Sequence, residues 1–234
     1  MKKDKIIIVM PVYNEGKGIR SQIEAVFDCL NSLQRKYCLI IIDDGSTDLT
    51  GDILSGYKTD ENVILIRHRM NMGLGKALLC GLIKAQEVSN EGDVIITMES
   101  DSTNEIACLR KIIDCIDKGW DIVVCSRLRE KGGLKGFPVC RRMTTVAVNK
   151  ILKFIFPYKG LTDYSMIYRG YNAGLIKELF ESHQNAPIKF FGFASTGELL
   201  LRLIFLKPGI EIIEIYDAFI NEFYRCLSKV NERA

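Results

Sequence analysis

Five short runs of apolar, largely β-branched residues recur through the first half of the chain: KIIIVM (5–10), YCLIII (37–42), NVILI (62–66), DVIIT (93–97) and DIVVC (121–125). Runs of this length without polar alternation predict strands buried on both faces. Segments with helical patterning lie between them, at 17–35, 48–57, 73–88 and 105–117. This alternation predicts an α/β fold with right-handed crossovers, in which helices sandwich a mostly parallel central sheet.

The pattern changes after residue 125. Residues 126–138 are rich in Gly, Lys and Arg, which is typical of a surface loop. The elements expected after it are a helix at 139–156, a strand at 164–169, helices at 171–180 and near 194–206, and a strand at 209–216. We therefore expect one domain over 1–234, with a nucleotide-binding half (1–125) and an acceptor-binding half (126–234).

Composition narrows the class of protein. The net charge of +3 is too small to indicate nucleic-acid binding by itself. The eight cysteines show no metal-ligand spacing, so we expect small buried hydrophobes in a reducing cytoplasm. The apolar run after the first lysines is shorter than the roughly 7–15 residues of a signal peptide, and no run reaches the ~20 residues of a membrane span. The chain is expected to be soluble, or at most to lie on a membrane.

Polar residues follow four of the predicted strands directly: PVYNEG (11–16), DDGSTD (43–48), ESDS (99–102) and SRLRE (126–130). Ligands of open parallel sheets bind beyond the carboxyl ends of the strands. The four loops therefore predict one site at one edge of the sheet.

Several motifs resemble, in order, those of family 2 glycosyltransferases, above all dolichyl-phosphate mannosyltransferases and other polyprenyl-phosphate sugar transferases. They are PVYNE (11–15), DDGSTD (43–48), NMGLGKAL (71–78), MESD (98–101), CSR (125–127), DYSMIYRGYN (163–172) and SK (228–229). The resemblance implies the Rossmann-like GT-A fold and an inverting, metal-dependent glycosyltransferase. It also implies donor-binding roles for Pro11 and Tyr13.

Asp43 and Asp44 stand on a turn made tight by Gly45, where either carboxylate can accept a hydrogen bond from a base N–H, with Glu15 near the ribose. The sequence DDGSTD is also typical of a tight turn followed by the N-cap of a helix, which is the alternative interpretation. Gly73 and Lys76 would place backbone amides and a cation near phosphate, although Lys76 is equally well read as a solvated helix residue.

Glu99 and Asp101 place two carboxylates at the end of a buried strand. In an extended segment they point to the same side, with Ser100 opposite. Mg²⁺ or Mn²⁺ prefers one or two carboxylates plus substrate phosphates, so this pair predicts a metal site for the leaving diphosphate. The alternative is a solvated strand end with Asp101 capping the next helix. Glu99 stands where the family has Asp, which makes Asp101 the stronger metal ligand.

The resemblance implies that Arg127, Arg141 and Arg142 lie near the donor and acceptor phosphates, and Arg169, which matches a family arginine, is also expected at the acceptor phosphate. Guanidinium groups pair with phosphate, although a solvated surface loop is the alternative for this basic stretch. Lys229 matches the family's closing lysine and is expected at the donor. Glu198 falls near the family's catalytic base, but is equally well explained as a first-turn helix charge. His68 and His183 are isolated and receive no role.

The resemblance thus implies transfer of a sugar from a GDP- or UDP-sugar to a polyprenyl phosphate at the cytoplasmic face of a membrane. Asp101 and Arg127 are expected at the reaction centre, and membrane contact is either direct or through a membrane partner; no nucleic-acid partner is expected. Two alternatives remain. One is a transferase acting on a sugar hydroxyl with Glu198 as base, since only a hydroxyl must lose a proton. The other is a non-catalytic nucleotide-sugar-binding subunit.

Overall fold

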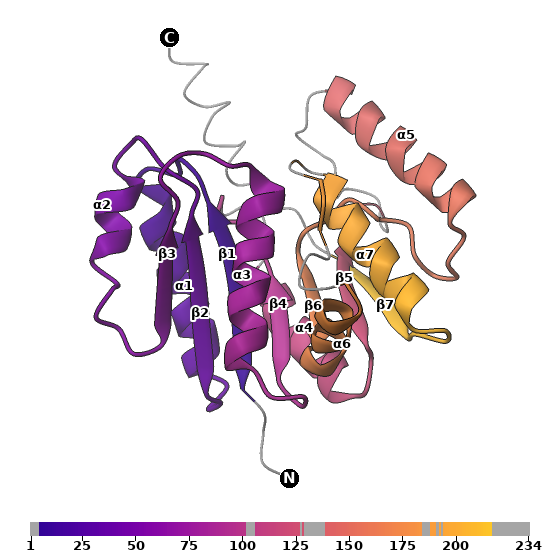
Figure 1. Ribbon diagram of the computed structural model, residues 1–234, viewed down its shortest axis with the longest axis horizontal. Helices are drawn as coiled ribbons and strands as arrows, with labels where there is room; N and C mark the ends of the chain where they lie inside the picture. The colour runs from indigo at the N-terminus through magenta and orange to yellow at the C-terminus, as the bar shows by residue number, and fades with distance from the viewer. Residues whose placement is uncertain are drawn as a thin grey trace.

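The computed structural model describes residues 5–101, 106–126, 128, 139–183, 188–190, 192 and 194–216 (Figure 1). A seven-stranded sheet has the order β3-β2-β1-β4-β6-β5-β7. The strands are β1 (Ile6–Val12), β2 (Tyr37–Asp43), β3 (Val63–Arg67), β4 (Val94–Thr97), β5 (Ile122–Ser126), β6 (Arg169–Asn172) and β7 (Ile212–Tyr216). Neighbouring strands run parallel except at β6, which is antiparallel to both β4 and β5. The expected mostly parallel sheet is confirmed.

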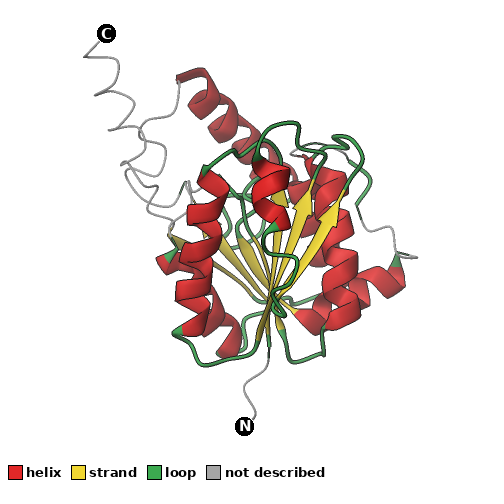
Figure 2. Cartoon of the chain, turned by 90° about the vertical axis from the view of Figure 1, so that its left-hand side faces the viewer, coloured by secondary structure: helices red, strands yellow, loops and turns green. Residues whose placement is uncertain are grey.

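The helices cover both faces of the sheet, as Figure 2 shows with the strands seen between two helical layers. They are α1 (Gly18–Asn31), α2 (Thr50–Ser55), α3 (Leu74–Val88), α4 (Ala107–Asp117), α5 (Val139–Ile155), α6 (Ala173–Ser182) and α7 (Ala194–Leu206). Contacts join α1 to α2 and α4 in one layer, and α3 to α6 and α7 in the other. Burial on both faces explains the unbroken apolar letters of β1, whose seven side chains are all buried.

The strand expected at 164–169 begins only at Arg169. The preceding residues looked like a strand because Tyr164, Met166, Ile167 and Tyr168 are all buried. Side chains, not a neighbouring strand, satisfy part of this segment's backbone. The Tyr164 N–H donates to Asn149 Oδ1 at 2.6 Å, and the Thr97 hydroxyl donates to the carbonyl of Ile167 at 2.5 Å. The segment 164–167 is therefore a non-regular stretch held by side-chain hydrogen bonds. It is called the 164–167 wall below, because it lines two cavities.

Glycine 170 explains how β6 fits beneath α4. A Cβ atom at this position would lie 2.2 Å from Ile112 Cγ2, which is closer than any real contact. The absence of a side chain lets the helix pack directly on the strand.

The cysteine side chains that the structure describes are mostly sheltered from solvent. Three of the six described cysteines are buried and three are half-buried, and all six are free thiols. Among the residues that the structure describes, no helix combines the length and hydrophobicity needed to cross a bilayer. The loop expected at 126–138 lies outside the described residues except for Ser126 and Leu128.

Candidate active site

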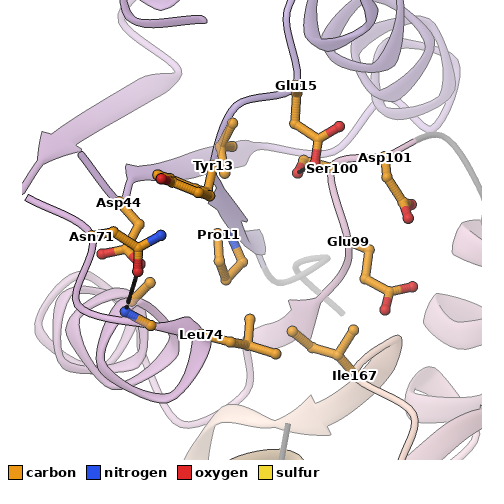
Figure 3. A pocket seen from close by; sticks show the side chains of 13 residues that line it. Pro11, Tyr13, Glu15, Asp44, Asn71, Leu74, Glu99, Ser100, Asp101 and Ile167 are labelled. Atoms are coloured by element: carbon orange, nitrogen blue, oxygen red, sulfur yellow. Dashed lines mark hydrogen bonds between the residues drawn. The ribbon is translucent and has the colours of Figure 1, made fainter. Parts of the chain in front are cut away.

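A cavity of about 280 Å³ opens at the carboxyl ends of β1, β2 and β4, the edge at which the sequence predicts a site (Figure 3). It brings together residues from five separate segments: Pro11, Val12, Tyr13, Glu15, Asp44, Asn71, Gly73, Leu74, Ala77, Glu99, Ser100, Asp101 and Ile167. Seven of the predicted donor or metal residues are in this set. Asp43 and Lys76 do not line the cavity.

The loops around the cavity are fastened to one another by side chains. Asn14, which has a positive φ of 54°, donates its N–H to the hydroxyl of Ser46 at 3.0 Å and accepts from the Thr47 N–H at 2.8 Å. The Gly16 N–H donates to Thr50 Oγ1 at 2.8 Å. These bonds hold the loop after β1 against the loop after β2. The residues that form the turns therefore also fix the geometry of the cavity wall.

Asp44 is buried on the cavity wall and organises the turn that precedes α3. Its Oδ1 accepts from the Met72 N–H at 3.0 Å and lies 2.7 Å from His68 Nδ1, while Oδ2 accepts from the Gly73 N–H at 2.8 Å. Gly73 has a φ of 87°, a conformation that glycine adopts without strain. Each carboxylate oxygen can accept two hydrogen bonds, so Oδ2 retains capacity for a ligand N–H.

Asp43 stabilises the turn and does not face the cavity. Its Oδ1 accepts from the Ser46 N–H at 2.9 Å, which closes the DDGS turn. Its Oδ2 lies 3.1 Å from Arg67 Nε, an ion-pair distance without the alignment of a hydrogen bond. Of the two carboxylates predicted to meet a base, only Asp44 faces the cavity.

Glu99 and Asp101 lie across the cavity from Asp44 and Asn71 (Figure 3). Ser100 between them is buried, and its hydroxyl donates to Glu15 Oε1 at 3.1 Å. This is the expected alternation, with the two carboxylates on one side and the serine on the other. Asp101 is not the N-cap of α4, since Ile106 occupies that position and makes no side-chain cap.

The chemistry of this end of the cavity suits a hard divalent cation. Burial raises the pKa of the Glu15 carboxyl, and the negative charge of Asp101 raises it further. Within the described part of the chain, no group of three or more acidic, His or Cys side chains forms a complete metal cage. Mg²⁺ or Mn²⁺ is commonly bound by one or two protein carboxylates, with substrate phosphates and water completing its coordination shell.

A second cavity, of about 640 Å³, lies between α5 and α7 and is mostly apolar. Its wall includes Val148, Leu152, Leu201 and Phe205, with Tyr164 and Ser165 of the 164–167 wall. Ile167, at the other end of that wall, lines the first cavity. One short segment therefore contributes to the walls of both cavities.

Glu198 lies at this second cavity, but its carboxylate is engaged. Oε2 accepts from the N–H groups of Lys189 and Phe190 at 2.8 and 2.9 Å, and Oε1 pairs with Arg202 at 2.7 Å. Burial alone would raise the pKa of Glu198, but the hydrogen bonds and Arg202 outweigh it and lower the pKa. A general base needs a pKa near the working pH, so this environment favours a structural role.

Arg169 corrects one expectation. Its side chain is fully buried, and the guanidinium donates to the carbonyls of Thr196 at 2.5 Å and Tyr164 at 2.8 Å. Its Nε is buried without a hydrogen-bond partner among the described residues. Arg169 therefore joins the 164–167 wall to α7 and is not exposed to an acceptor phosphate. The sequence alone does not reveal this, because a motif position gives no burial.

Several expected residues fall elsewhere. Arg127 and Lys229 lie outside the described residues, and so do the side chains of Arg141 and Arg142 at the start of α5. Sequence reasoning missed His68. The strand register explains why His68 meets Asp44. Strands β2 and β3 pair Asp43 with Arg67, so the next residues, Asp44 and His68, are also neighbours.

Comparisons with known proteins agree with this geometry. The sequence profile of Glycosyl transferase family 2 matches residues 7–181. Undecaprenyl-phosphate 4-deoxy-4-formamido-L-arabinose transferase from Shewanella sediminis is 27% identical over 197 residues, which cover 82% of this chain and 56% of the relative. The same enzyme from Edwardsiella ictaluri is 24% identical over 81% of this chain and 56% of the relative. The chain spans just over half the length of these curated relatives.

Solved structures share the fold. Glucosyl-3-phosphoglycerate synthase from Mycobacterium tuberculosis, in complex with Mn²⁺, UDP and phosphoglyceric acid, aligns with a TM-score of 0.64 at 18% identity, over 96% of this chain and 74% of that chain. S. aureus TarS 1–349 aligns with a TM-score of 0.57 at 16% identity, over 94% of this chain and 62% of that chain. With the family profile matching three quarters of its length, the chain belongs to glycosyl transferase family 2 and has the GT-A fold.

Proposed function

We propose that this chain transfers a sugar from a nucleotide-sugar to a polyprenyl phosphate, with inversion at the anomeric carbon. The observation that carries the proposal is the first cavity, in which a buried aspartate faces two carboxylates across an open space of about 280 Å³. The curated relatives named for undecaprenyl-phosphate transfer support the acceptor class.

The donor would lie along this cavity, within the first half of the chain (1–125). Asp44 Oδ2 would accept an N–H of the base, and the half-exposed ring of Tyr13 offers an apolar surface over Pro11. Glu15 lies beside the carboxylate pair, within reach of a ribose or phosphate. The UDP in the structurally similar synthase supports a UDP-sugar over a GDP-sugar.

Asp101, with Glu99 beside it, would hold Mg²⁺ or Mn²⁺ at the diphosphate. The bound cation would supply charge neutralisation to the leaving nucleoside diphosphate. Mn²⁺ and Mg²⁺ complexes of the structurally similar synthase support this choice of metal. The chain's own part is to fix the two carboxylates on one side of a loop whose middle residue, Ser100, is anchored to Glu15.

The attacking group is proposed to be a phosphate oxygen. A phosphate is already an anion and needs no base, whereas a sugar hydroxyl does. The engagement of Glu198 with Lys189, Phe190 and Arg202 therefore supports the phosphate acceptor over the hydroxyl acceptor. Arg127, Arg141 and Arg142 are proposed to neutralise the acceptor phosphate, and Lys229 to contact the donor. Such an acceptor places the reaction at the cytoplasmic surface of a membrane.

The test is release of nucleoside diphosphate from a panel of UDP- and GDP-sugars with Mg²⁺ or Mn²⁺, with and without a short-chain polyprenyl phosphate. We expect lipid-stimulated release from a UDP-sugar that is lost in Asp101→Ala. Donor binding without release on any acceptor would overturn the proposal in favour of a binding subunit. Release stimulated only by sugar acceptors and lost in Glu198→Gln would favour the hydroxyl-acceptor transferase.

A further inference from the structure

Helix α5 is exposed around most of its circumference although it is rich in large apolar residues. Between residues 143 and 155 only Asn149 is buried. Phe154 is 87% exposed, and the other exposed large apolar side chains of the helix are Met143, Val148, Ile151 and Ile155. Exposed apolar clusters of this kind mark interaction surfaces in soluble domains. This cluster is hereafter the α5 apolar surface.

Hydrogen bonds of Asn149 join the helix to the 164–167 wall. Asn149 Nδ2 donates to the hydroxyl of Ser165 at 3.1 Å, and its Oδ1 accepts from the Tyr164 N–H at 2.6 Å. The apolar cavity separates the helix from α7 on either side of this anchor. In Figure 1, α5 lies beyond α7, at the far side of the molecule from β3. Within the α5 apolar surface Val148 also lines the apolar cavity, whereas Met143, Ile151, Phe154 and Ile155 are exposed and do not line it.

The charged residues in and directly after this helix are all of one sign. The stretch 139–160 contains five basic residues and no Asp or Glu: Arg141, Arg142, Lys150, Lys153 and Lys159. The three lysines are exposed. A helix that combines exposed aromatic and aliphatic residues with lysines is typical of segments lying in the interface of an anionic bilayer.

We propose that the α5 apolar surface docks the protein on an anionic lipid bilayer, with Ile151, Phe154 and Ile155 among the lipid chains and Lys150 and Lys153 at the headgroups. A second copy of the chain is a poorer occupant, because a two-fold contact through this helix would bring the same positive charges together. The exposed apolar side chains and the lysines beside them therefore favour a negatively charged lipid surface.

The inference rests on the proposed function, which it deepens by naming the docking surface and the lipid charge. The anchor residue Asn149 bonds to the 164–167 wall, whose Ile167 lines the donor cavity. A bilayer at α5 would thus lie on the acceptor side of that wall. This would bring a lipid-borne phosphate near the reaction centre without a spanning helix in the described residues.

The test is sedimentation of the full chain with vesicles of phosphatidylcholine alone, or of phosphatidylcholine and phosphatidylglycerol in equal parts. We expect binding to the anionic vesicles only. The double variant Ile151→Ser/Phe154→Ser should weaken it at least about tenfold, because two exposed apolar side chains lose their lipid contact. Lys150→Gln and Lys153→Gln should each weaken it roughly fivefold.

Leu49→Ser is the matched control, because Leu49 is 56% exposed against 57% for Ile151 and is the N-cap residue of α2, away from α5. Its vesicle binding should equal that of the unmodified chain. UDP binding, measured by calorimetry in every variant, separates the two proposals: it should persist in all of them. Absent vesicle binding with intact UDP binding overturns only the docking surface. A dimer that the double variant converts to monomers, without vesicle binding, assigns the surface to a second copy.

Discussion

The two cavities on either side of the 164–167 wall are built in opposite ways. The donor cavity is small and is fixed by hydrogen bonds between loops, such as those that Asp44 accepts from Met72 and Gly73. The cavity between α5 and α7 is about twice as large and is bounded by apolar side chains of two helices. Hydrogen bonds are directional whereas apolar contacts are not, so the first cavity specifies one ligand geometry and the second tolerates variety.

This difference suits the two proposed substrates. A nucleotide presents fixed donors and acceptors, which a rigid polar site can select. A lipid chain presents only apolar surface, for which an adaptable groove suffices. If this difference holds, substitutions at the first cavity should change donor affinity or turnover, and those around the second cavity should change mainly stability.

The largest effect is expected from Asp101→Ala. Loss of the stronger of the two proposed metal carboxylates should lower transferase activity by about a thousandfold, because charge stabilisation by such a cation contributes several kcal/mol. The measurement is nucleoside diphosphate release at saturating donor. Asp114→Ala, an exposed aspartate on α4, is the control of equal charge change. Equal activity in both variants would remove Asp101 from the site.

Arg169→Met tests the wall itself. The variant leaves the buried carbonyls of Tyr164 and Thr196 without their donor, so we expect the free energy of unfolding to fall by about 2–4 kcal/mol. Chemical denaturation measures this change. Arg20→Met, an exposed arginine on α1, should change it by less than about 0.5 kcal/mol. If both variants are equally stable, Arg169 does not join the wall to α7.

His68→Ala tests the rigidity of the donor side. Asp44 would lose one of its three partners, and the affinity for UDP should fall about five- to tenfold, as expected for one hydrogen bond of about 1–1.4 kcal/mol. The rate constant at saturating donor should stay nearly unchanged, since His68 does not line the cavity. His183→Ala replaces the chain's other histidine, at the end of α6, and should leave affinity as it is. An unaltered affinity in His68→Ala would contradict a positioning role.

The smallest effect is expected from Glu198→Gln. Transferase activity on a polyprenyl phosphate should stay within about threefold, whereas loss of a true base costs about a hundredfold or more. The lowered pKa of Glu198 means that its ionised form stabilises the fold at neutral pH, and that this contribution is lost as pH falls through the depressed pKa. The stability difference between the two proteins should therefore be below about 1 kcal/mol at pH 7 and should vanish in acid. If the stability difference between the two proteins persists in acid, ionisation of Glu198 is not its cause.

Sequence reasoning performed unevenly across the chain for physical reasons. The first five strands were predictable because parallel strands between two helical layers are apolar throughout, as β1 and β2 are. The 164–167 wall was mistaken for a strand because burial leaves the same apolar letters in both structures. Only the hydrogen bonds of Asn149 and Thr97 distinguish the two, and they join residues distant in sequence.

The site was predictable to the extent that it stands at strand ends. Glu99, Asp101 and Asp44 reach the cavity because they follow β4 and β2 directly. The roles of Asp43, Arg169 and His68 depended on burial and on partners that no local pattern encodes. The contact of His68 with Asp44 follows from the sheet register, which only the structure gives.

Hydrogen bonds to the 164–167 wall connect the linings of the two cavities. Thr97, in the strand that leads to Glu99, is bonded to Ile167, and Asn149 of α5 is bonded to Tyr164 three residues away. A ligand that shifts this segment from one side changes the affinity on the other side. Linkage requires the effect to be equal in both directions. Filling the apolar cavity should therefore alter the dissociation constant of the donor by the same factor by which the donor alters that of the lipid.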